Sequence, residues 1–241
     1  MQARWTRELR NYLFQKAGLS YAHRVLEVGC GTGAILCEGT PPDQALVKGA
    51  AFYGIDVLPS ALAECRVHAP GAFLTCGDGL KLPYLDKVFD ITYCHFLLLW
   101  VIDPLEVLRE MKRTTRPQGH ILALAEPDYT ARVYRSYEIS SLGKIQTDSL
   151  NKQGADVSIG SRLADIFYQA GIKILESGKI RDRSEAITRE EWENEWEVME
   201  SDLAGYVPKE ELIEIKHLDE QVWKRGEYRL SVPTYFAWGQ V

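Results

Sequence analysis

The chain has 241 residues, a net charge of −6 and 46% apolar residues. This length suits a single α/β domain with an elaboration, and the apolar content is too high for a disordered chain. The negative charge argues mildly against binding to a nucleic-acid backbone, and no apolar run approaches the about 20 residues that span a bilayer.

The five cysteines favour a reduced, cytoplasmic protein. They form no CxxC pair and their number is odd, so we expect neither a disulfide framework nor a metal site. The first residues, MQARWTRELR, lack the apolar stretch of a secretory signal. A cytoplasmic location without membrane or nucleic-acid partners is the simplest interpretation.

Strands and helices are predicted to alternate along the first half of the chain. A helix over residues 3–18 comes first, because Trp5, Leu9 and Leu13 have helical spacing. Strands are expected at 24–28, 51–55, 73–76, 88–93 and 120–125, with helices after the first strand, at 59–68 and at 104–115. This alternation predicts an α/β fold with a doubly wound, mostly parallel sheet. Ligands of such sheets bind beyond the carboxyl ends of the strands.

The pattern changes after residue 125. A helix is expected to end before Gly171, and further strands are expected at 172–180 and 228–238. Between these strands, residues 181–226 form an acidic insertion with a capping box from Thr188 to Glu191. No linker separates it, so we expect one domain over residues 1–241 that carries a helical cap at about 181–226.

The strongest local signal is an apolar strand that runs into three glycines, VLEVGCGTG at residues 25–33. Glycine permits positive φ and lets a ligand approach the backbone, and the following helix offers free N–H groups. Gly29, Gly31 and Ala34 also satisfy the dinucleotide pattern GxGxxG/A. The motif alone therefore does not name the ligand.

Two further strand ends carry a carboxylate. Asp56 ends the second strand, where it can accept both hydroxyl hydrogens of a ribose, a feature that NAD-binding proteins share. Asp78 lies between Gly77 and Gly79 after the third strand and could accept a hydrogen bond from an adenine amino group. A simple dinucleotide fold has no requirement for this third position.

With these motifs in this order, the sequence resembles the class I S-adenosylmethionine-dependent methyltransferases, in particular their ubiquinone-biosynthesis-like small-molecule branch. The motifs are LEVGCGTG, YGIDVLPSAL, GDGLKLPYLDKVFD and RPQGHILALAEPD, between residues 24 and 128, and the ending PTYFAWG. The resemblance implies a Rossmann-like sheet of seven strands with an antiparallel last strand. It also implies in-line transfer of a methyl group from S-adenosylmethionine to a small-molecule acceptor.

The resemblance assigns a role to the glycine motif. Gly29, Gly31 and Gly33 would line the methionine and ribose of the cofactor, and Glu27 would orient the loop or reach the amino group through water. The sequence departs from the family at Gly39-Thr40-Pro41-Pro42, which shortens the first helix of the sheet.

The other cofactor positions follow in the same way. Asp56 would bind the ribose hydroxyls, with Val57 against the adenine, and Asp78 would meet the adenine amino group. Cys94 and His95, at the end of the fourth strand, would lie beside the methionine moiety.

Methyl transfer depends mainly on alignment of the two reactants, and a general base is needed only if the acceptor loses a proton early. His95 is the candidate base, because its unperturbed pKa lies near physiological pH; alternatively, it packs or binds substrate without moving a proton. Glu126, Asp128 and Tyr129 follow the fifth strand and could face the acceptor. Turn chemistry around Pro127 explains them equally well.

The cap helix has two interpretations. Trp192, Trp196, Met199 and Leu203 recur on one helical face. This stripe either docks the cap on the core or forms a wall of the acceptor site, with Trp192 as the candidate contact. We expect a monomer or a homodimer.

The same residues leave three alternatives open. An NAD(P)-dependent oxidoreductase explains the glycines and Asp56 but gives Asp78 no role. A non-catalytic cofactor-binding or interaction module is disfavoured by the intact Gly29, Gly31, Asp56 and Asp78. A methyltransferase that acts on a peptide or protein is the third alternative, because an acidic cap could hold a basic peptide.

Overall fold

The computed structural model describes residues 6–39, 49–134, 140–180, 188–226 and 230–241. Some sequence predictions fall outside these ranges. They concern residues 3–5 of the first helix, the Thr40-Pro41-Pro42 segment, residues 181–187 of the cap and residues 228–229 of the last predicted strand.

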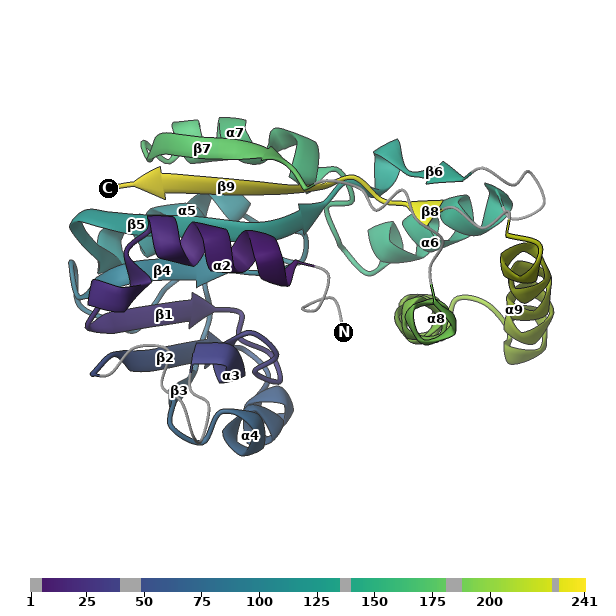
Figure 1. Ribbon diagram of the computed structural model, residues 1–241, viewed down its shortest axis with the longest axis horizontal. Coiled ribbons are helices and arrows are strands. Elements are labelled where there is room, and N and C mark those ends of the chain that lie inside the picture. The colour runs from purple at the N-terminus through teal and green to yellow at the C-terminus, as the bar shows by residue number, and fades with distance from the viewer. Residues whose placement is uncertain (1–5, 40–48, 135–139, 181–187, 227–229) are drawn as a thin grey trace.

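Within the described residues, a seven-stranded sheet forms the centre of the larger lobe (Figure 1). Its strand order is β3-β2-β1-β4-β5-β9-β7, and β9 runs antiparallel to both β5 and β7. The strands are β1 (Arg24–Val28), β2 (Ala51–Asp56), β3 (Phe73–Cys76), β4 (Phe89–Cys94), β5 (Thr115–Pro127), β7 (Lys173–Lys179) and β9 (Thr234–Gln240). The predicted mostly parallel sheet with an antiparallel last strand is confirmed.

Helices cover both faces of this sheet. Helices α2 (Arg7–Lys16), α3 (Leu36–Gly39) and α4 (Pro59–His68) share one apolar cluster with Val25 and Leu122. Helices α5 (Pro104–Thr114) and α7 (Ile159–Gln169) share the other with Leu26 and Ile121. Neighbouring residues of a strand point to opposite faces, so each buried strand contributes to both clusters. A 3-10 turn, η1 (Leu19–Tyr21), connects α2 to β1.

Most predicted boundaries agree with the structure, but two do not. The single strand predicted at 228–238 is divided into β8 (Leu230–Ser231) and β9, which belong to different sheets. The start of β5 also differs. The strand was expected at 120–125 and begins at Thr115. Thr115 pairs with Phe89, and the next pair joins His120 to Ile91, so residues 116–119 bulge out of the ladder. Pro117 and Gly119, which indicate a break in the sequence, lie in this bulge. The first helix after the glycines, α3, is short, as expected.

The cap lies beyond the carboxyl ends of the parallel strands (Figure 1). Helices α8 (Arg189–Leu203) and α9 (Lys209–Lys224) form within the predicted helical cap. Helix α6 (Ser140–Lys152), which the sequence analysis missed, packs against α8. The strand pair β6 (Val133–Tyr134) and β8 (Leu230–Ser231) and the 3-10 turn η2 (Tyr129–Ala131) belong to the connections between sheet and cap.

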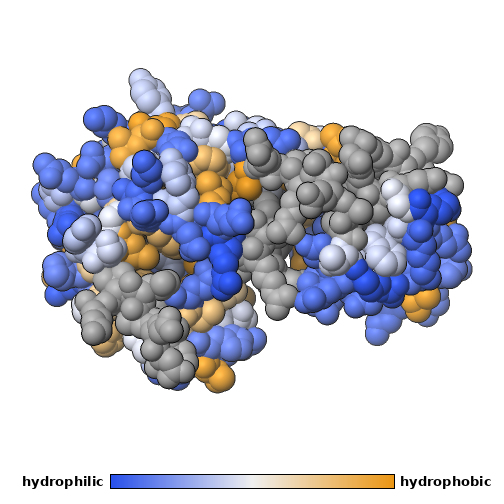
Figure 2. Space-filling model, viewed as in Figure 1, coloured by the Kyte–Doolittle hydropathy of each residue, from blue (hydrophilic) through white to orange (hydrophobic). Residues whose placement is uncertain are grey.

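The two lobes differ in the surface that they present. Figure 2 shows hydrophilic residues over the outer side of the cap and apolar patches scattered over the larger lobe. The glutamates of α8 and α9 make the cap acidic. Among the described residues, no helix is both long enough and apolar enough to cross a membrane.

Candidate active site

The glycine loop follows β1 at its carboxyl end. Gly29, Gly31 and Gly33 have φ angles of +72°, +50° and +84°, which side-chain-bearing residues rarely adopt. Gly29 N donates to Ile55 O at 2.8 Å, which ties the loop to β2. An ideal Cβ at Gly29 would lie 2.6 Å from Leu97 Cδ1, whereas one at Gly31 would meet nothing within 4 Å. The Leu97 side chain therefore fills the space beside Gly29, whereas the space beside Gly31 is free of atoms of the described residues.

Asp56, at the end of β2, reaches this loop. Its Oδ2 accepts a hydrogen bond from Gly31 N at 2.8 Å, and its Oδ1 accepts one from Leu58 N at 2.9 Å. A carboxylate has about four lone-pair sites, so both oxygens can still accept hydroxyl hydrogens from a ligand. Val57 follows directly, and its side chain is 64% exposed.

The segment after β3 lies against the neighbouring strands. Asp78 is exposed, and its Oδ1 accepts a hydrogen bond from Leu80 N at 2.9 Å. An ideal Cβ at Gly77 would lie 3.0 Å from Ile55 Cδ1, and one at Gly79 would lie 3.3 Å from Val28 Cγ1. Both glycines thus allow the segment that carries Asp78 to pack closely on β1 and β2.

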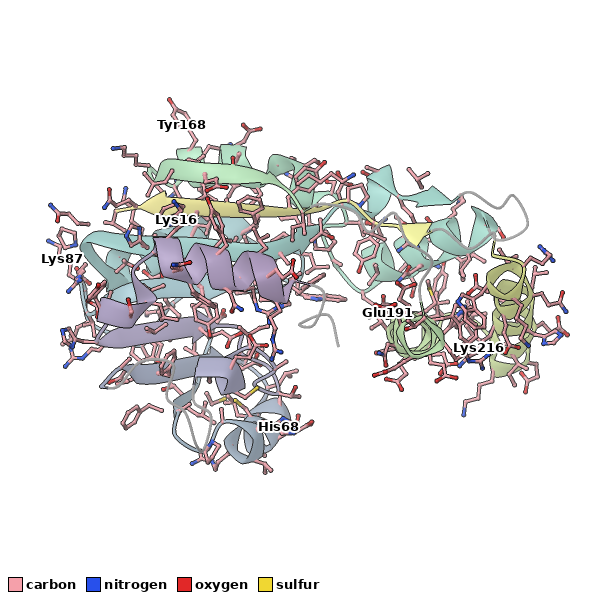
Figure 3. All side chains as sticks on the ribbon, in the orientation of Figure 1. Lys16, His68, Lys87, Tyr168, Glu191 and Lys216 are labelled. Carbon is pink, nitrogen blue, oxygen red and sulfur yellow. The ribbon has the colours of Figure 1, made fainter. Side chains whose placement is uncertain are left out.

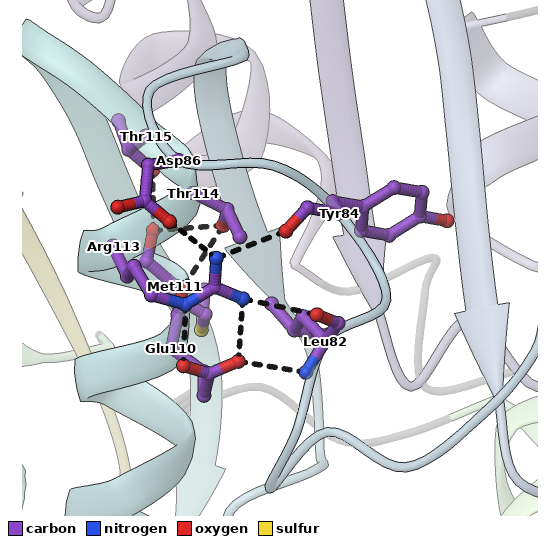
Figure 4. A network of polar contacts seen from close by, with 8 residues as sticks. All are labelled: Leu82, Tyr84, Asp86, Glu110, Met111, Arg113, Thr114 and Thr115. Carbon is purple, nitrogen blue, oxygen red and sulfur yellow. Dashed lines mark hydrogen bonds and ion pairs between the residues drawn. The ribbon is translucent and has the colours of Figure 1, made fainter.

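Arg113 of α5 fastens the chain that follows Asp78 (Figure 4). Its Nη1 donates to Tyr84 O at 2.9 Å and its Nη2 donates to Leu82 O at 2.9 Å. Glu110 Oε2 accepts from Leu82 N at 2.8 Å, and hydrogen bonds from Arg113 help to lower the pKa of Glu110. This pair was not predicted from the sequence, although a spacing of three residues on a helix places two side chains side by side.

Glu27 lies inside the core beneath the glycine loop. It is 2% exposed, and its Oε2 accepts a hydrogen bond from Tyr93 Oη at 3.0 Å. Burial raises the pKa of Glu27 to about 8, against the opposing effects of the Tyr93 hydrogen bond and the nearby Arg10 charge. Its predicted role in orienting the loop or meeting the cofactor stays a prediction.

Helix α2 brings a buried cation to this region. Arg10 is 0% exposed, and its Nη2 lies 2.8 Å and 2.7 Å from the two carboxylate oxygens of Glu38 on α3. Its Nη1 donates to Thr6 Oγ1, which in turn lies 3.4 Å from His95 Nε2. The helical spacing of this segment predicts none of these three contacts, because the partners Glu38 and His95 lie far away along the chain.

Cys94 and His95 lie where β4 ends, as the sequence analysis placed them. Cys94 is fully buried, and burial raises the pKa of its thiol. Burial lowers the pKa of His95 to about 3, and the charge of Arg10 adds a smaller effect in the same direction. The imidazole is therefore neutral at physiological pH. It meets the ring of Phe96 edge to face, with centroids 4.8 Å apart.

Glu126, near the end of β5, and Asp128, just after it, accept hydrogen bonds from backbone N–H groups. Glu126 is fully buried and accepts hydrogen bonds from Leu97 N and Leu98 N. Asp128 accepts hydrogen bonds from two backbone N–H groups of η2 and so caps that turn. Tyr129 is 9% exposed. Only the Asp128 bonds are local turn contacts of the kind that the sequence offered as the alternative, since the partners of Glu126 lie 28 and 29 residues away along the chain. Contact of these residues with an acceptor stays a prediction.

Trp192 lies in the interior of the cap. It is 2% exposed, and its Nε1 donates to Asp219 Oδ2 of α9 at 2.8 Å. Trp196 Nε1 donates to the same oxygen at 2.5 Å. The two indoles thus join α8 to α9, and the predicted contact of Trp192 with an acceptor stays a prediction.

A pocket of about 330 Å³ lies elsewhere, at the amino ends of β4 and β5. Its lining includes Lys87 and Arg109 but none of the predicted site residues. Figure 3 places Lys87 at the end of the sheet away from the cap. In the part of the chain that the structure describes, no group of three His, Cys, Asp or Glu side chains could hold a metal ion.

The Glu27 carboxyl predicts how stability depends on pH. Its pKa of about 8 in the folded chain exceeds the ordinary 4.5, so between these values the folded chain holds a proton that the unfolded chain has released. The free energy of unfolding must then fall as pH rises from about 5 to about 8. In the wild type we expect the free energy of unfolding to fall by more than about 1.4 kcal/mol over this range, the equivalent of one pKa unit. We expect Glu27→Gln to abolish this decrease. Urea denaturation of both proteins across this range measures it; parallel pH profiles would contradict the prediction.

Known proteins match the region that holds these residues. Residues 26–123 match a family model described as a methyltransferase domain. The ubiquinone biosynthesis O-methyltransferase of Vibrio campbellii is 32% identical over 122 residues, which are 46% of this chain and 47% of that protein. The chain therefore spans about half the length of the curated relatives that it matches.

Solved structures share the whole fold. A methyltransferase candidate from Bacillus halodurans has a TM-score of 0.66 and 15% identity, over 95% of this chain and 97% of that chain. The cyclase SpnF has a TM-score of 0.59 and 19% identity, over 97% and 80% of the two chains. At these identities the likeness shows the fold alone, and a fold of this kind can host different chemistries.

Proposed function

We propose that the chain transfers a methyl group from S-adenosylmethionine to a small-molecule acceptor, and the match of residues 26–123 to a methyltransferase domain is the premise of this proposal. The observation that carries the proposal is the glycine loop, which is open beside Gly31 and bridged to β2 by Asp56. An ordinary strand–helix turn requires neither the open space nor the carboxylate.

The nucleoside half of the cofactor fits the carboxylates after β2 and β3. In the proposal, Asp56 accepts the ribose hydroxyls on lone pairs that its backbone partners leave free. Asp78 accepts the adenine amino group, with Val57 beside the ring. Both Asp78 and Val57 are exposed and so accessible to a ligand, which supports this assignment.

The methionine half would lie between Gly29 and the end of β4, beside Cys94 and His95. When bound, the cofactor supplies a methyl group activated by its sulfonium. Alignment of this methyl with the acceptor is then the main task of the protein.

His95 is the residue that we propose beside the transferred methyl group. With a pKa of about 3, its imidazole is neutral and can accept a hydrogen bond from the acceptor. The same low pKa makes it an inefficient general base at neutral pH, because a base works best with a pKa near the working pH. Orientation of the acceptor is therefore its favoured role. A cytoplasmic location and a monomer or homodimer stay predictions.

Cofactor binding tests the proposal. We expect titration calorimetry to show saturable binding of S-adenosylmethionine or S-adenosylhomocysteine and none of NAD. Asp56→Ala removes two charge-assisted hydrogen bonds, each typically worth about 1.5–3 kcal/mol. The dissociation constant should rise at least about tenfold, the equivalent of about 1.4 kcal/mol.

Asp103→Ala is the matched control, since Asp103 also accepts a backbone N–H, from Glu106 at the start of α5. This variant should bind the cofactor as the wild type does. Saturable binding of NAD with no response to either sulfur compound would refute the methyltransferase proposal. An unchanged dissociation constant for Asp56→Ala would place the ribose elsewhere.

A further inference from the structure

The turn after β4 has an unusual backbone. Phe96 has a φ of +51°, which bulky residues rarely adopt and which costs of order 1–3 kcal/mol. Phe96 N donates to Ala125 O of β5 at 2.9 Å, and Trp100 N donates to Leu97 O at 2.9 Å. Contacts with β5 therefore hold this turn in a strained form.

One buried carboxylate caps the turn. Glu126, at the end of β5, is 0% exposed, and its Oε1 accepts hydrogen bonds from Leu97 N at 3.0 Å and Leu98 N at 3.1 Å. Free N–H groups at the start of a helical turn favour such an acceptor. Burial raises the pKa of Glu126 to about 7, and the backbone hydrogen bonds oppose this effect. Among the described residues, Glu126 Oε2 has no hydrogen-bond partner.

The capped turn faces the glycine loop. An ideal Cβ at Gly29 would lie 2.6 Å from Leu97 Cδ1, so the Leu97 side chain fills the space that a side chain at Gly29 would take. The preceding residues, His95 and Phe96, place their rings in contact at the same end of β4. A shift of this turn would therefore move both the wall at Gly29 and the His95 ring.

We infer that Glu126 is a positioning residue of the methyl-transfer site: its carboxylate caps the turn of residues 97–99 and, through that turn, sets Leu97 against Gly29 and His95 at the end of β4. The inference rests on the proposed function, because Leu97 and His95 affect cofactor binding only if the methionine half lies at Gly29. In this inference Glu126 acts on the site by positioning Leu97 and His95, and it does not contact the acceptor itself.

A double-mutant cycle tests this role. Glu126→Gln keeps the size of the side chain and one acceptor oxygen but can no longer ionise. Leu97→Ala removes the side chain beside Gly29 and leaves Glu126 in place. We expect each change to raise the dissociation constant of S-adenosylhomocysteine about tenfold, and the double variant to raise it by about the same factor. Residues that act as one unit show such non-additivity. Asp103→Asn, which alters a carboxylate cap on α5, should leave the constant unchanged.

Three results would overturn the inference. The first is a Glu126→Gln protein that melts earlier but binds the cofactor as the wild type does, since the role would then be structural only. The second is an increase of about one hundredfold in the double variant, since independent sites multiply their effects. The third, decisive even if Glu126→Gln does not fold, is wild-type affinity in Leu97→Ala. A wild-type protein that binds neither sulfur compound would instead refute the proposed function itself.

Discussion

Replacement of Trp196 by alanine is expected to destabilise the cap by about 3–5 kcal/mol, the usual cost of removing a buried tryptophan. The side chain is 1% exposed and its ring centroid lies 6.1 Å from that of Trp192. The indole also donates to Asp219, a residue that is 1% exposed. Burial raises the pKa of this carboxyl, and the two indole hydrogen bonds oppose that effect. Loss of one of them leaves a buried acid with a single indole donor.

Thermal melting followed by circular dichroism measures this effect. Trp196→Phe keeps one aromatic ring but loses the N–H donor and part of the buried volume of the indole, so we expect an intermediate loss of about 1–3 kcal/mol. Tyr168→Ala removes an aromatic side chain that is 79% exposed on α7, and its effect should stay within about 0.5 kcal/mol. A Trp196→Ala protein as stable as the Tyr168→Ala protein would contradict the prediction.

Removal of Glu38 is expected to cost more than removal of its partner Arg10. Glu38→Ala leaves the fully buried Arg10 guanidinium without its carboxylate, and an uncompensated buried charge costs about 3–5 kcal/mol. Arg10→Met leaves Glu38, whose side chain is 20% exposed and can be hydrated. We expect about 3 kcal/mol for Glu38→Ala and about half of that for Arg10→Met.

Arg7 provides the control for this pair. It contacts the same Glu38 at 3.3 Å, but its side chain is 65% exposed, and pairs of that kind are worth about 0–1 kcal/mol. Urea denaturation of Glu38→Ala, Arg10→Met and Arg7→Met should therefore give three distinct losses in that order. Equal losses for Glu38→Ala and Arg7→Met would show that the buried charge is satisfied by other groups.

The elements that the sequence predicts well are those with a strong local signal. β1 and β3 are short apolar runs, and α4 begins at Pro59, a residue that suits the first helical turn. Helix α6 lacks an apolar stripe, because Gln146 and Ser149 occupy buried positions on it. Their partner is Asp202 of α8, which no local pattern reveals.

The candidate site divides in the same way. Gly29, Gly31 and Asp56 are visible in the sequence because a strand leads into glycines or ends in a carboxylate. Arg10 and Glu126 are different, because their roles depend on partners that lie 28 or more residues away along the chain. For Trp192 the helical spacing was visible in the sequence. That spacing is equally compatible with two roles, packing of the cap on the core and contact with an acceptor.

The place of β9 in the sheet has a consequence for how the chain is made. Strand β9 lies between β5 and β7 and pairs with β5, for example Gly239 with Ile121. The residues of β5 leave the ribosome long before those of β9. Contacts between residues so far apart in sequence form slowly. Until β9 arrives, β5 and β7 each present an open edge on which another strand can pair. The nascent chain is therefore most exposed to mispairing while the cap is being synthesised, and chaperone demand should be highest at that stage.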